Sequence, residues 1–140
     1  MASREKIEEF LAEPRNAIVI GLRRDGSPQA TPNWFSFDGE HFYVSTTRKR
    51  AKYQIFSRDP RVELVIDDPV GRRYIAVSGT VHIHEEIEPV LSIFRTTRRK
   101  YSIPVPSDAE FLAALTGEGR VLLEVTPNGP MSSWRVNGLD

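Results

Sequence analysis

Apolar and polar residues alternate with a period of two in several segments of the chain, which is typical of half-buried β-strands. In the segment from Arg61 to Asp67, for example, Val62, Leu64 and Ile66 share one face. The pattern predicts strands at residues 17–22, 29–37, 41–45, 61–67, 74–85, 120–126 and 131–136. Most of the strands are joined by turns of hairpin length, an order that favours an antiparallel closed or half-closed barrel over a parallel sheet.

The remaining apolar residues recur at helical spacing. Ile7, Phe10 and Leu11 form one stripe of a helix that we expect from residue 4 to residue 12, with Ser3 as its cap. Other helices are predicted directly after the third strand, at residues 86–101, and from Ser107 to a stop at Gly117. The chain is therefore expected to be mainly β, with six or seven short antiparallel strands and peripheral helices.

Three positions refine the predicted strands. The segment from Ala17 to Leu22 is apolar on both faces, so we expect it to be central and buried. Pro32 interrupts the second strand and implies an edge, a bulge or a strand end. Gly79 lies within the longest strand, where a bulge or a close approach of another backbone is expected.

Length and composition narrow the possible classes of protein. The 140 residues predict one domain, residues 1–140, and the 19 basic residues equal the 19 acidic ones. Broad electrostatic attraction to nucleic acid or to a membrane surface is therefore not expected. The absence of cysteine excludes disulfides and thiolate sites and is compatible with the cytoplasm. The charged N-terminus does not read as a signal peptide, and no apolar run reaches membrane-spanning length.

The segment from Tyr43 to Arg61 carries the most informative chemistry. Three hydroxyl side chains, Ser45, Thr46 and Thr47, precede the cations Arg48, Lys49, Arg50 and Lys52. No acidic residue occurs between His41 and Arg58. Cations and hydroxyls at a strand-to-helix junction suit a phosphorylated, polyhydroxylated ligand, because the helix N-terminus adds oriented N–H groups. A solvated charged loop is the alternative interpretation of such a run.

No catalytic constellation stands out elsewhere. His82 and His84 share one strand face, but no carboxylate or cysteine is arranged with them in the sequence, so no metal site is predicted. Trp34 and Trp134 are most simply core residues. Trp134 has little apolar company in its own segment, so we expect it to be buried against a second subunit or a flat ligand ring.

The order of several short motifs resembles the pyridoxamine 5′-phosphate oxidase-like superfamily, and more narrowly its coenzyme F420-dependent (deazaflavin) oxidoreductase branch. The resemblance covers roughly residues 5 to 136. The matching pieces are Gly26-Ser27-Pro28, Trp34-Phe35, Ser45-Thr46-Thr47, Arg50-Ala51-Lys52, Ser57-Arg58-Asp59-Pro60-Arg61-Val62 and Val77-Ser78-Gly79-Thr80.

This resemblance implies a split β-barrel homodimer with cofactor sites at the subunit interface. It places the ribityl chain and phosphate of the cofactor on Ser45, Arg50, Ala51 and Lys52, together with the neighbouring Thr46 and Thr47. It places the tricyclic ring along Pro32, Asn33 and Trp34, with Trp134 near the pocket. Lys49 and Arg58 would suit the additional negative charge of a deazaflavin tail.

Two departures from the superfamily pattern affect the expected substrate and helix packing. Ile55-Phe56 stands where many relatives have Asn-Leu, which bears on helix packing. The segment 135–140 does not match the Arg-x-x-x-Arg-Leu-x-Pro ending of true pyridoxamine phosphate oxidases, so a vitamin B6 substrate is not expected.

The resemblance thus implies a cytoplasmic, F420-dependent oxidoreductase that transfers hydride to a small electron-poor substrate, such as an enone or a quinone-like compound. No catalytic side chain is predicted, because the cofactor carries the hydride. The alternatives are an FMN-dependent oxidase or reductase on the same fold and a non-catalytic F420-binding carrier. The expected partners are a second copy of the chain and the small-molecule substrate, with no nucleic acid and no membrane.

Overall fold

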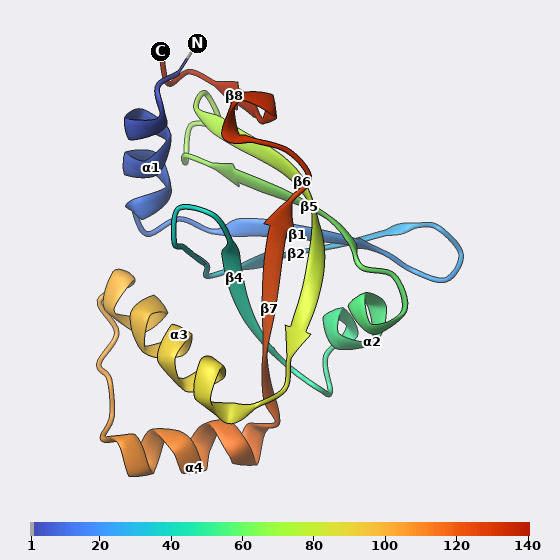
Figure 1. Ribbon diagram of the computed structural model, residues 1–140, viewed down its shortest axis with the longest axis vertical. Coiled ribbons are helices and arrows are strands. Elements are labelled where there is room, and N and C mark those ends of the chain that lie inside the picture. Colours follow the sequence, from blue (N-terminus) through green and yellow to red (C-terminus); the bar gives the residue numbers. More distant parts are fainter. Residues whose placement is uncertain (1) are drawn as a thin grey trace.

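The computed structural model describes residues 2–140 and shows one strongly curved antiparallel sheet that forms a half-barrel (Figure 1). The strands are β1 (Ala17–Leu22), β2 (Pro28–Asn33), β3 (Ser36–Phe37), β4 (Phe42–Thr47), β5 (Arg61–Asp67), β6 (Tyr74–His84), β7 (Arg120–Pro127) and β8 (Arg135–Asn137). Their order is β2-β1-β5-β6-β7-β4-β3, and β8 pairs with β6. The mainly β, half-closed barrel expected from the sequence is confirmed.

Four helices lie at the periphery of the sheet. They are α1 (Arg4–Ala12), α2 (Ala51–Arg58), α3 (Ile87–Lys100) and α4 (Asp108–Glu118). Figure 1 shows α3 and α4 together at one end of the molecule, α2 on another side, and α1 beside both chain termini. Ser3 and Ser107 cap α1 and α4, as predicted. Their hydroxyls accept hydrogen bonds from the backbone N–H groups of Lys6 and Glu110.

Several predicted element bounds differ from the structure, and the strand predicted at residues 29–37 is two strands, β2 and β3, separated by Trp34 and Phe35. Gly119, not Gly117, ends α4, since its φ of 67° is the left-handed conformation that a helix end commonly requires. The predicted strand at 131–136 is a short 3₁₀ turn at Met131–Ser133 followed by β8. The turn forms because the Ser133 hydroxyl and backbone N–H both donate to the carbonyl of Pro130.

The strand details agree with the sequence more closely. Pro32 lies in β2, which is an edge strand of the sheet order, as its missing N–H requires. A Cβ on Gly79 would lie 2.7 Å from the carbonyl oxygen of Thr126, so the expected close backbone approach is confirmed. β1 is paired on both edges, by β2 and β5, but Ile18, Ile20 and Leu22 on one of its faces are only half-buried.

The apolar side chains form two cores, one on each face of β7. Leu123 belongs to the larger core inside the barrel, whereas the adjacent Leu122 packs with Val90, Phe111 and Leu115 beneath α3 and α4. Neighbouring side chains of a strand point to opposite faces, so this alternation divides β7 between the two layers. The face of β4 and β7 that α3 covers therefore lies outside the barrel core.

Trp134 has more apolar neighbours than its own segment of the sequence suggested. Its ring centroid lies 5.8 Å from that of Phe37 and 5.5 Å from that of Phe42, and the side chain is partly buried within the one chain. Sheet pairing thus brings distant aromatic residues to Trp134, but the side chain is not fully buried within the one chain, as expected, and its burial against a second subunit or a flat ligand ring stays a prediction. Among residues 2–140, no helix has the length and apolar character needed to cross a membrane.

Candidate functional site

A pocket of about 390 Å³ lies where α3 faces the sheet, and we call it the α3 pocket. It is lined by Asn16, Pro32, Asn33, Trp34, Ser45, Arg50, Phe94, Thr97, Arg98 and Arg120. Five of these residues, Pro32, Asn33, Trp34, Ser45 and Arg50, belong to the predicted cofactor site. The structure therefore brings the β2–β3 connection, the middle of β4 and the start of α2 to one cavity.

Ser45 reaches the pocket because of the alternation along β4. Phe42, Val44 and Thr46 point into the barrel core, so Ser45 points to the face that α3 covers. Its Oγ is buried and has no hydrogen-bond partner among residues 2–140. A buried hydroxyl without a partner costs about 1–3 kcal/mol, so a ligand that bonds it recovers that free energy.

The other two predicted hydroxyl residues occupy different environments. Thr46 is completely buried on the barrel side of β4, and its Oγ1 also has no partner within the described chain. Thr47, at the end of β4, is 9% exposed, and its carbonyl accepts the N–H of Arg50. Of the three consecutive hydroxyls, only that of Ser45 lines the α3 pocket.

The start of α2 provides positive charge and oriented donors. Arg50 is the N-cap residue, with extended backbone angles (φ −87°, ψ 154°), and the helix has no side-chain cap. Ala51 is the first helical residue. An uncapped N-terminus leaves backbone N–H groups for an anion, which the helix dipole also favours. The Arg50 side chain lines the pocket directly.

Lys52 lies behind this helix start and not in the wall of the pocket. It is only 5% exposed, and its Nζ donates to the Thr31 hydroxyl of β2 at 2.9 Å. Burial, and to a smaller extent the nearby charge of Arg50, lowers the pKa of Lys52 below its usual value. This buried ammonium lies beside a neutral hydroxyl and a second cation. An approaching anion would therefore stabilise its charged form.

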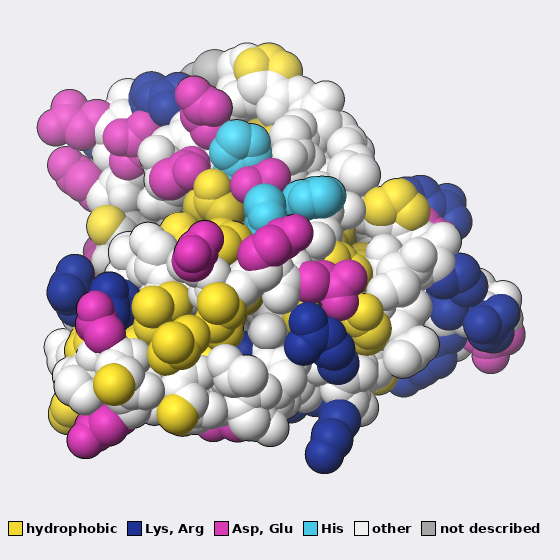
Figure 2. Space-filling view, turned by 60° about the horizontal axis from the view of Figure 1, so that its bottom comes forward, with side chains coloured by type: hydrophobic (Ala, Val, Ile, Leu, Met, Phe, Trp, Pro, Cys, Tyr) yellow, Lys and Arg dark blue, Asp and Glu magenta, His cyan; other side chains and the backbone are white. Residues whose placement is uncertain are grey.

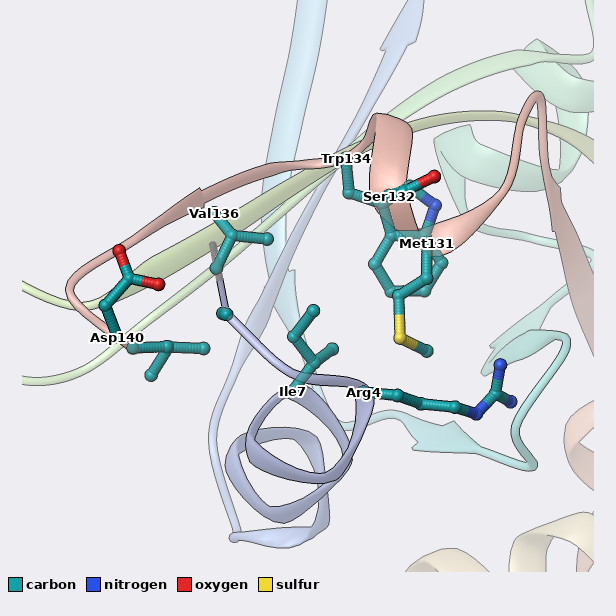
Figure 3. A pocket seen from close by; sticks show the side chains of 9 residues that line it. Arg4, Ile7, Met131, Ser132, Trp134, Val136 and Asp140 are labelled. Atoms are coloured by element: carbon teal, nitrogen blue, oxygen red, sulfur yellow. The ribbon is translucent and has the colours of Figure 1, made fainter.

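The remaining predicted residues lie away from the α3 pocket. Lys49 is exposed, and the guanidinium of Arg58 donates to the carbonyl of Leu22. Trp134 lines a different pocket, formed by α1 and the C-terminal segment and shown in Figure 3 with Met131 and Ile7. The roles of Lys49, Arg58 and Trp134 toward a cofactor stay predictions.

Trp34 is fixed at one end of the pocket by the end of α3. Its ring stacks on Tyr101, with centroids 4.9 Å apart and planes 14° from parallel. The Tyr101 hydroxyl donates to the carbonyl of Arg15 and accepts the Phe35 N–H at 3.2 Å, and burial raises the pKa of Tyr101. Trp34 itself remains 43% exposed, so a face of the pocket is aromatic and held in place.

Lys100 strengthens the same junction from the adjacent position of α3. Its Nζ donates to the carbonyls of Leu11 at 2.7 Å and Phe35 at 3.0 Å. Burial, and secondarily the charge of Arg15, lowers the pKa of Lys100 to about 8. These bonds tie α1, the β2–β3 connection and α3 together behind Trp34.

The α3 wall of the pocket contains residues that sequence reasoning did not find. Arg98 and Arg120 flank the ring of Phe94, with guanidinium carbons 5.5 Å and 5.3 Å from its centroid. In the sequence Arg98 is one of several basic residues at a helix end, and Arg120 only begins a strand. No local pattern signals their place in the pocket, because the docking of α3 brings Arg98, and the pairing of β7 with β4 brings Arg120, to the cavity that Arg50 lines.

The histidines do not line the α3 pocket, and Figure 2 shows them beside acidic side chains. The rings of His82 and His84 are 4.6 Å apart, and Nε2 of His84 lies 3.3 Å from Oε1 of Glu124. The expectation that no carboxylate accompanies these histidines is therefore wrong, since β7 supplies one across the sheet. No group of three or more potential ligands within residues 2–140 is arranged to hold a metal ion.

Most of the chain matches a known family of proteins. A family model described as pyridoxamine 5′-phosphate oxidase matches residues 3–129. A solved structure described as an F420 reductase is 29% identical with a TM-score of 0.70, and the match covers 87% of this chain and 93% of that one.

Two further solved structures, both below 25% identity, share the fold. A conserved hypothetical protein from Mycobacterium tuberculosis is 23% identical over 99% of this chain and 86% of its own, with a TM-score of 0.82. The heme storage protein HutZ from Vibrio cholerae is 15% identical over 99% of this chain and 96% of its own, with a TM-score of 0.75.

Proposed function

The chain belongs to the pyridoxamine 5′-phosphate oxidase family, and on that basis we propose that it is an oxidoreductase that binds coenzyme F420 in the α3 pocket. The observation that carries the proposal is the buried, unpartnered Oγ of Ser45 in the same cavity as Arg50, at the uncapped start of α2. A hydroxyl, a guanidinium and free helix N–H groups together suit a phosphate at the end of a hydroxylated chain.

Each part of the pocket then has a distinct binding role. Arg50 and the first N–H groups of α2 hold the phosphate, and Ser45 bonds the hydroxylated chain. The buried charge of Lys52, behind the helix start, attracts the phosphate without lining the pocket. Pro32, Asn33 and the fixed ring of Trp34 orient the planar ring system and shield it from water. When bound, the reduced deazaflavin supplies a hydride to an electron-poor carbon of an enone or quinone-like substrate. The protein contributes binding, orientation and exclusion of solvent.

Two alternatives remain on the same fold. FMN shares the ribityl phosphate with F420, so the residues around Ser45 and Arg50 suit both, and an FMN-dependent oxidase or reductase is the second candidate. The 29% identical F420 reductase supports the deazaflavin. A non-catalytic carrier is the third candidate, favoured only by the description of the similarly folded HutZ as a heme storage protein.

A titration with both cofactors distinguishes the three candidates. We expect F420 to bind more tightly than FMN, and the bound reduced form to be consumed only when an enone or quinone acceptor is added. Tighter binding of FMN, with reoxidation of its reduced form by oxygen, would replace the proposal with the flavin enzyme. Tight F420 binding with no turnover over a broad panel of acceptors would instead favour the carrier. Fluorescence and absorbance record all three outcomes.

We also propose that two copies of the chain associate through the outer face of β1, β5 and β6. Ile20 and Leu22 on that face are half-buried, and they line a shallow pocket of about 320 Å³ with Val62 and Gly79. A stable interface of this kind buries on the order of 2,000 Å² or more. Light scattering at low micromolar concentration is expected to give twice the 15.9 kDa subunit mass, and a single-subunit mass would contradict the dimer.

A further inference from the structure

Arg98 is a charged side chain of the α3 pocket with a buried nitrogen that lacks a hydrogen-bond partner among the described residues. Its Nη1 donates to the carbonyl of Pro104 at 2.8 Å, and its guanidinium lies over the rings of Phe94 and Phe111. Its Nε is buried and has no hydrogen-bond partner among residues 2–140. The contacts with Pro104 and the two rings hold the group in place, and they leave the edge formed by Nε and Nη2 for another partner.

The edge formed by Nε and Nη2 of Arg98 is suited to a carboxylate. Two parallel N–H groups of a guanidinium match the two oxygens of a carboxylate, and such bidentate pairs are among the strongest hydrogen-bonded contacts in proteins. Arg120, whose guanidinium carbon also lies close to the Phe94 ring, adds positive charge, although its Nε already donates to Glu118 at 2.7 Å. None of the described residues that line the pocket is acidic.

Arg98 belongs to a different element from the proposed phosphate site. It lies on α3, three residues before the Tyr101 that stacks on Trp34, whereas Arg50 and Lys52 belong to the start of α2. Arg120, which shares the Phe94 ring with Arg98, pairs with Thr47 just before that start. An anion held by Arg98 is therefore either a group of the substrate or part of the cofactor, and the cofactor affinities of Arg98 variants distinguish the two.

We propose that Arg98, assisted by Arg120, is a carboxylate-binding subsite that selects substrates carrying an anionic group beside their electron-poor carbon. This inference rests on the proposed function, because the substrate is defined relative to the cofactor ring. It adds a specificity-determining residue that lies on α3, outside the run of cations that follows β4. The alternative is that Arg98 has only a structural role and attaches α3 to the segment at Pro104.

Binding of benzoate to the cofactor-free protein tests the subsite without turnover. The chain has two tryptophans, so Trp134→Phe leaves Trp34 as the fluorescent reporter inside the pocket. We expect benzoate, but not neutral benzamide, to change this fluorescence saturably. Arg98→Met should weaken benzoate binding about tenfold or more, and Arg98→Lys should lose much of the affinity as well, because it keeps the charge but not the bidentate edge. Arg99→Met, at an exposed position of the same helix, is the matched control and should change affinity less than about twofold.

The cofactor affinities of the same variants show whether Arg98 binds a substrate carboxylate, the cofactor phosphate or the deazaflavin tail. The proposal expects Arg98→Met to leave the affinities for FMN and F420 within about threefold of the parent protein, and to raise KM for carboxylate-bearing acceptors more than for neutral ones. A similar loss of both cofactors would assign Arg98 to the phosphate, and a loss of F420 alone would assign it to the deazaflavin tail; either result overturns the substrate subsite.

The benzoate experiment also separates this inference from the cofactor assignment. Benzoate binding that depends on Arg98 in a protein that does not bind F420 would refute the proposed function and leave the carboxylate subsite standing. Normal F420 binding with equal affinity for benzoate and benzamide would refute the subsite alone. A variant that unfolds is identified by its circular dichroism, and Arg98→Lys then gives the comparison.

Discussion

Replacement of Phe42 by alanine is expected to destabilise the fold by about 3–5 kcal/mol, the range typical of a buried phenylalanine. Phe42 is completely buried and lies at the centre of an aromatic cluster, with ring centroids 4.5 Å from Phe37, 5.5 Å from Trp134 and 6.1 Å from Phe35. The substitution removes contacts of β3, β4 and the C-terminal segment at once. Denaturant unfolding, followed by far-ultraviolet circular dichroism, measures the change.

Leu112→Ala is the matched control for this prediction. Leu112 lies on α4 and is 40% exposed, so its truncation should change the free energy of unfolding by no more than about 1 kcal/mol. The fluorescence of Trp134, in contact with Phe42, should report the loss of packing. Equal midpoints for the Phe42→Ala and parent proteins would show that this cluster does not hold the barrel together.

Replacement of Lys52 by alanine is expected to weaken cofactor binding by roughly tenfold to a hundredfold and to leave the fold intact. The range corresponds to the loss of one charge-assisted hydrogen bond of about 1.5–3 kcal/mol. The fold should tolerate the change, because among residues 2–140 Nζ donates to the Thr31 hydroxyl alone, while burial and Arg50 disfavour the charge. A fluorescence titration of both proteins with cofactor measures the two affinities.

The pH dependence of binding gives this prediction an internal check. Burial lowers the pKa of Lys52, so its ammonium loses the proton at lower pH than an ordinary lysine as pH rises. An anion binds the charged form, so cofactor affinity should fall as pH passes upward through the lowered pKa, and Lys52→Ala should lack that decline. Lys49→Ala, at an exposed position, serves as control. Equal affinities of the Lys52→Ala and parent proteins would move the phosphate elsewhere.

The sequence was most informative where structure depends on neighbouring residues. Ser3 and Ser107 predicted the starts of α1 and α4, and the alternation of Val62, Leu64 and Ile66 predicted β5 at its observed bounds. Hydrophobic periodicity and capping act over a few residues, so they can be interpreted without knowledge of the rest of the chain. The Gly119 end of α4 and the 3₁₀ turn before Trp134 were not predicted. Gly117 and Gly119 can both end a helix, and only the backbone angles of the folded chain distinguish such alternatives.

The candidate site divides along the same line. Motif order predicted the family. It also predicted Ser45, Arg50 and the Pro32–Trp34 segment as cofactor-binding residues, and all of them line one pocket. Along β4 the run of three hydroxyls is a continuous patch in the sequence, yet the pleat of the strand sends Thr46 into the barrel and Ser45 toward α3.

Only the tertiary structure decided which distant residues complete the pocket and which do not. Arg98 reaches it because α3 docks across β4 and β7, and Arg120 because β7 pairs with β4. Trp134 lies in another pocket because sheet pairing brings it to Phe37 and Phe42. These contacts join residues far apart in the chain, and their geometry follows from the packing of whole elements. By itself the sequence therefore determined most of the elements, the family and one half of the pocket, and the packing of α3 and the pairing of the strands determined the other half.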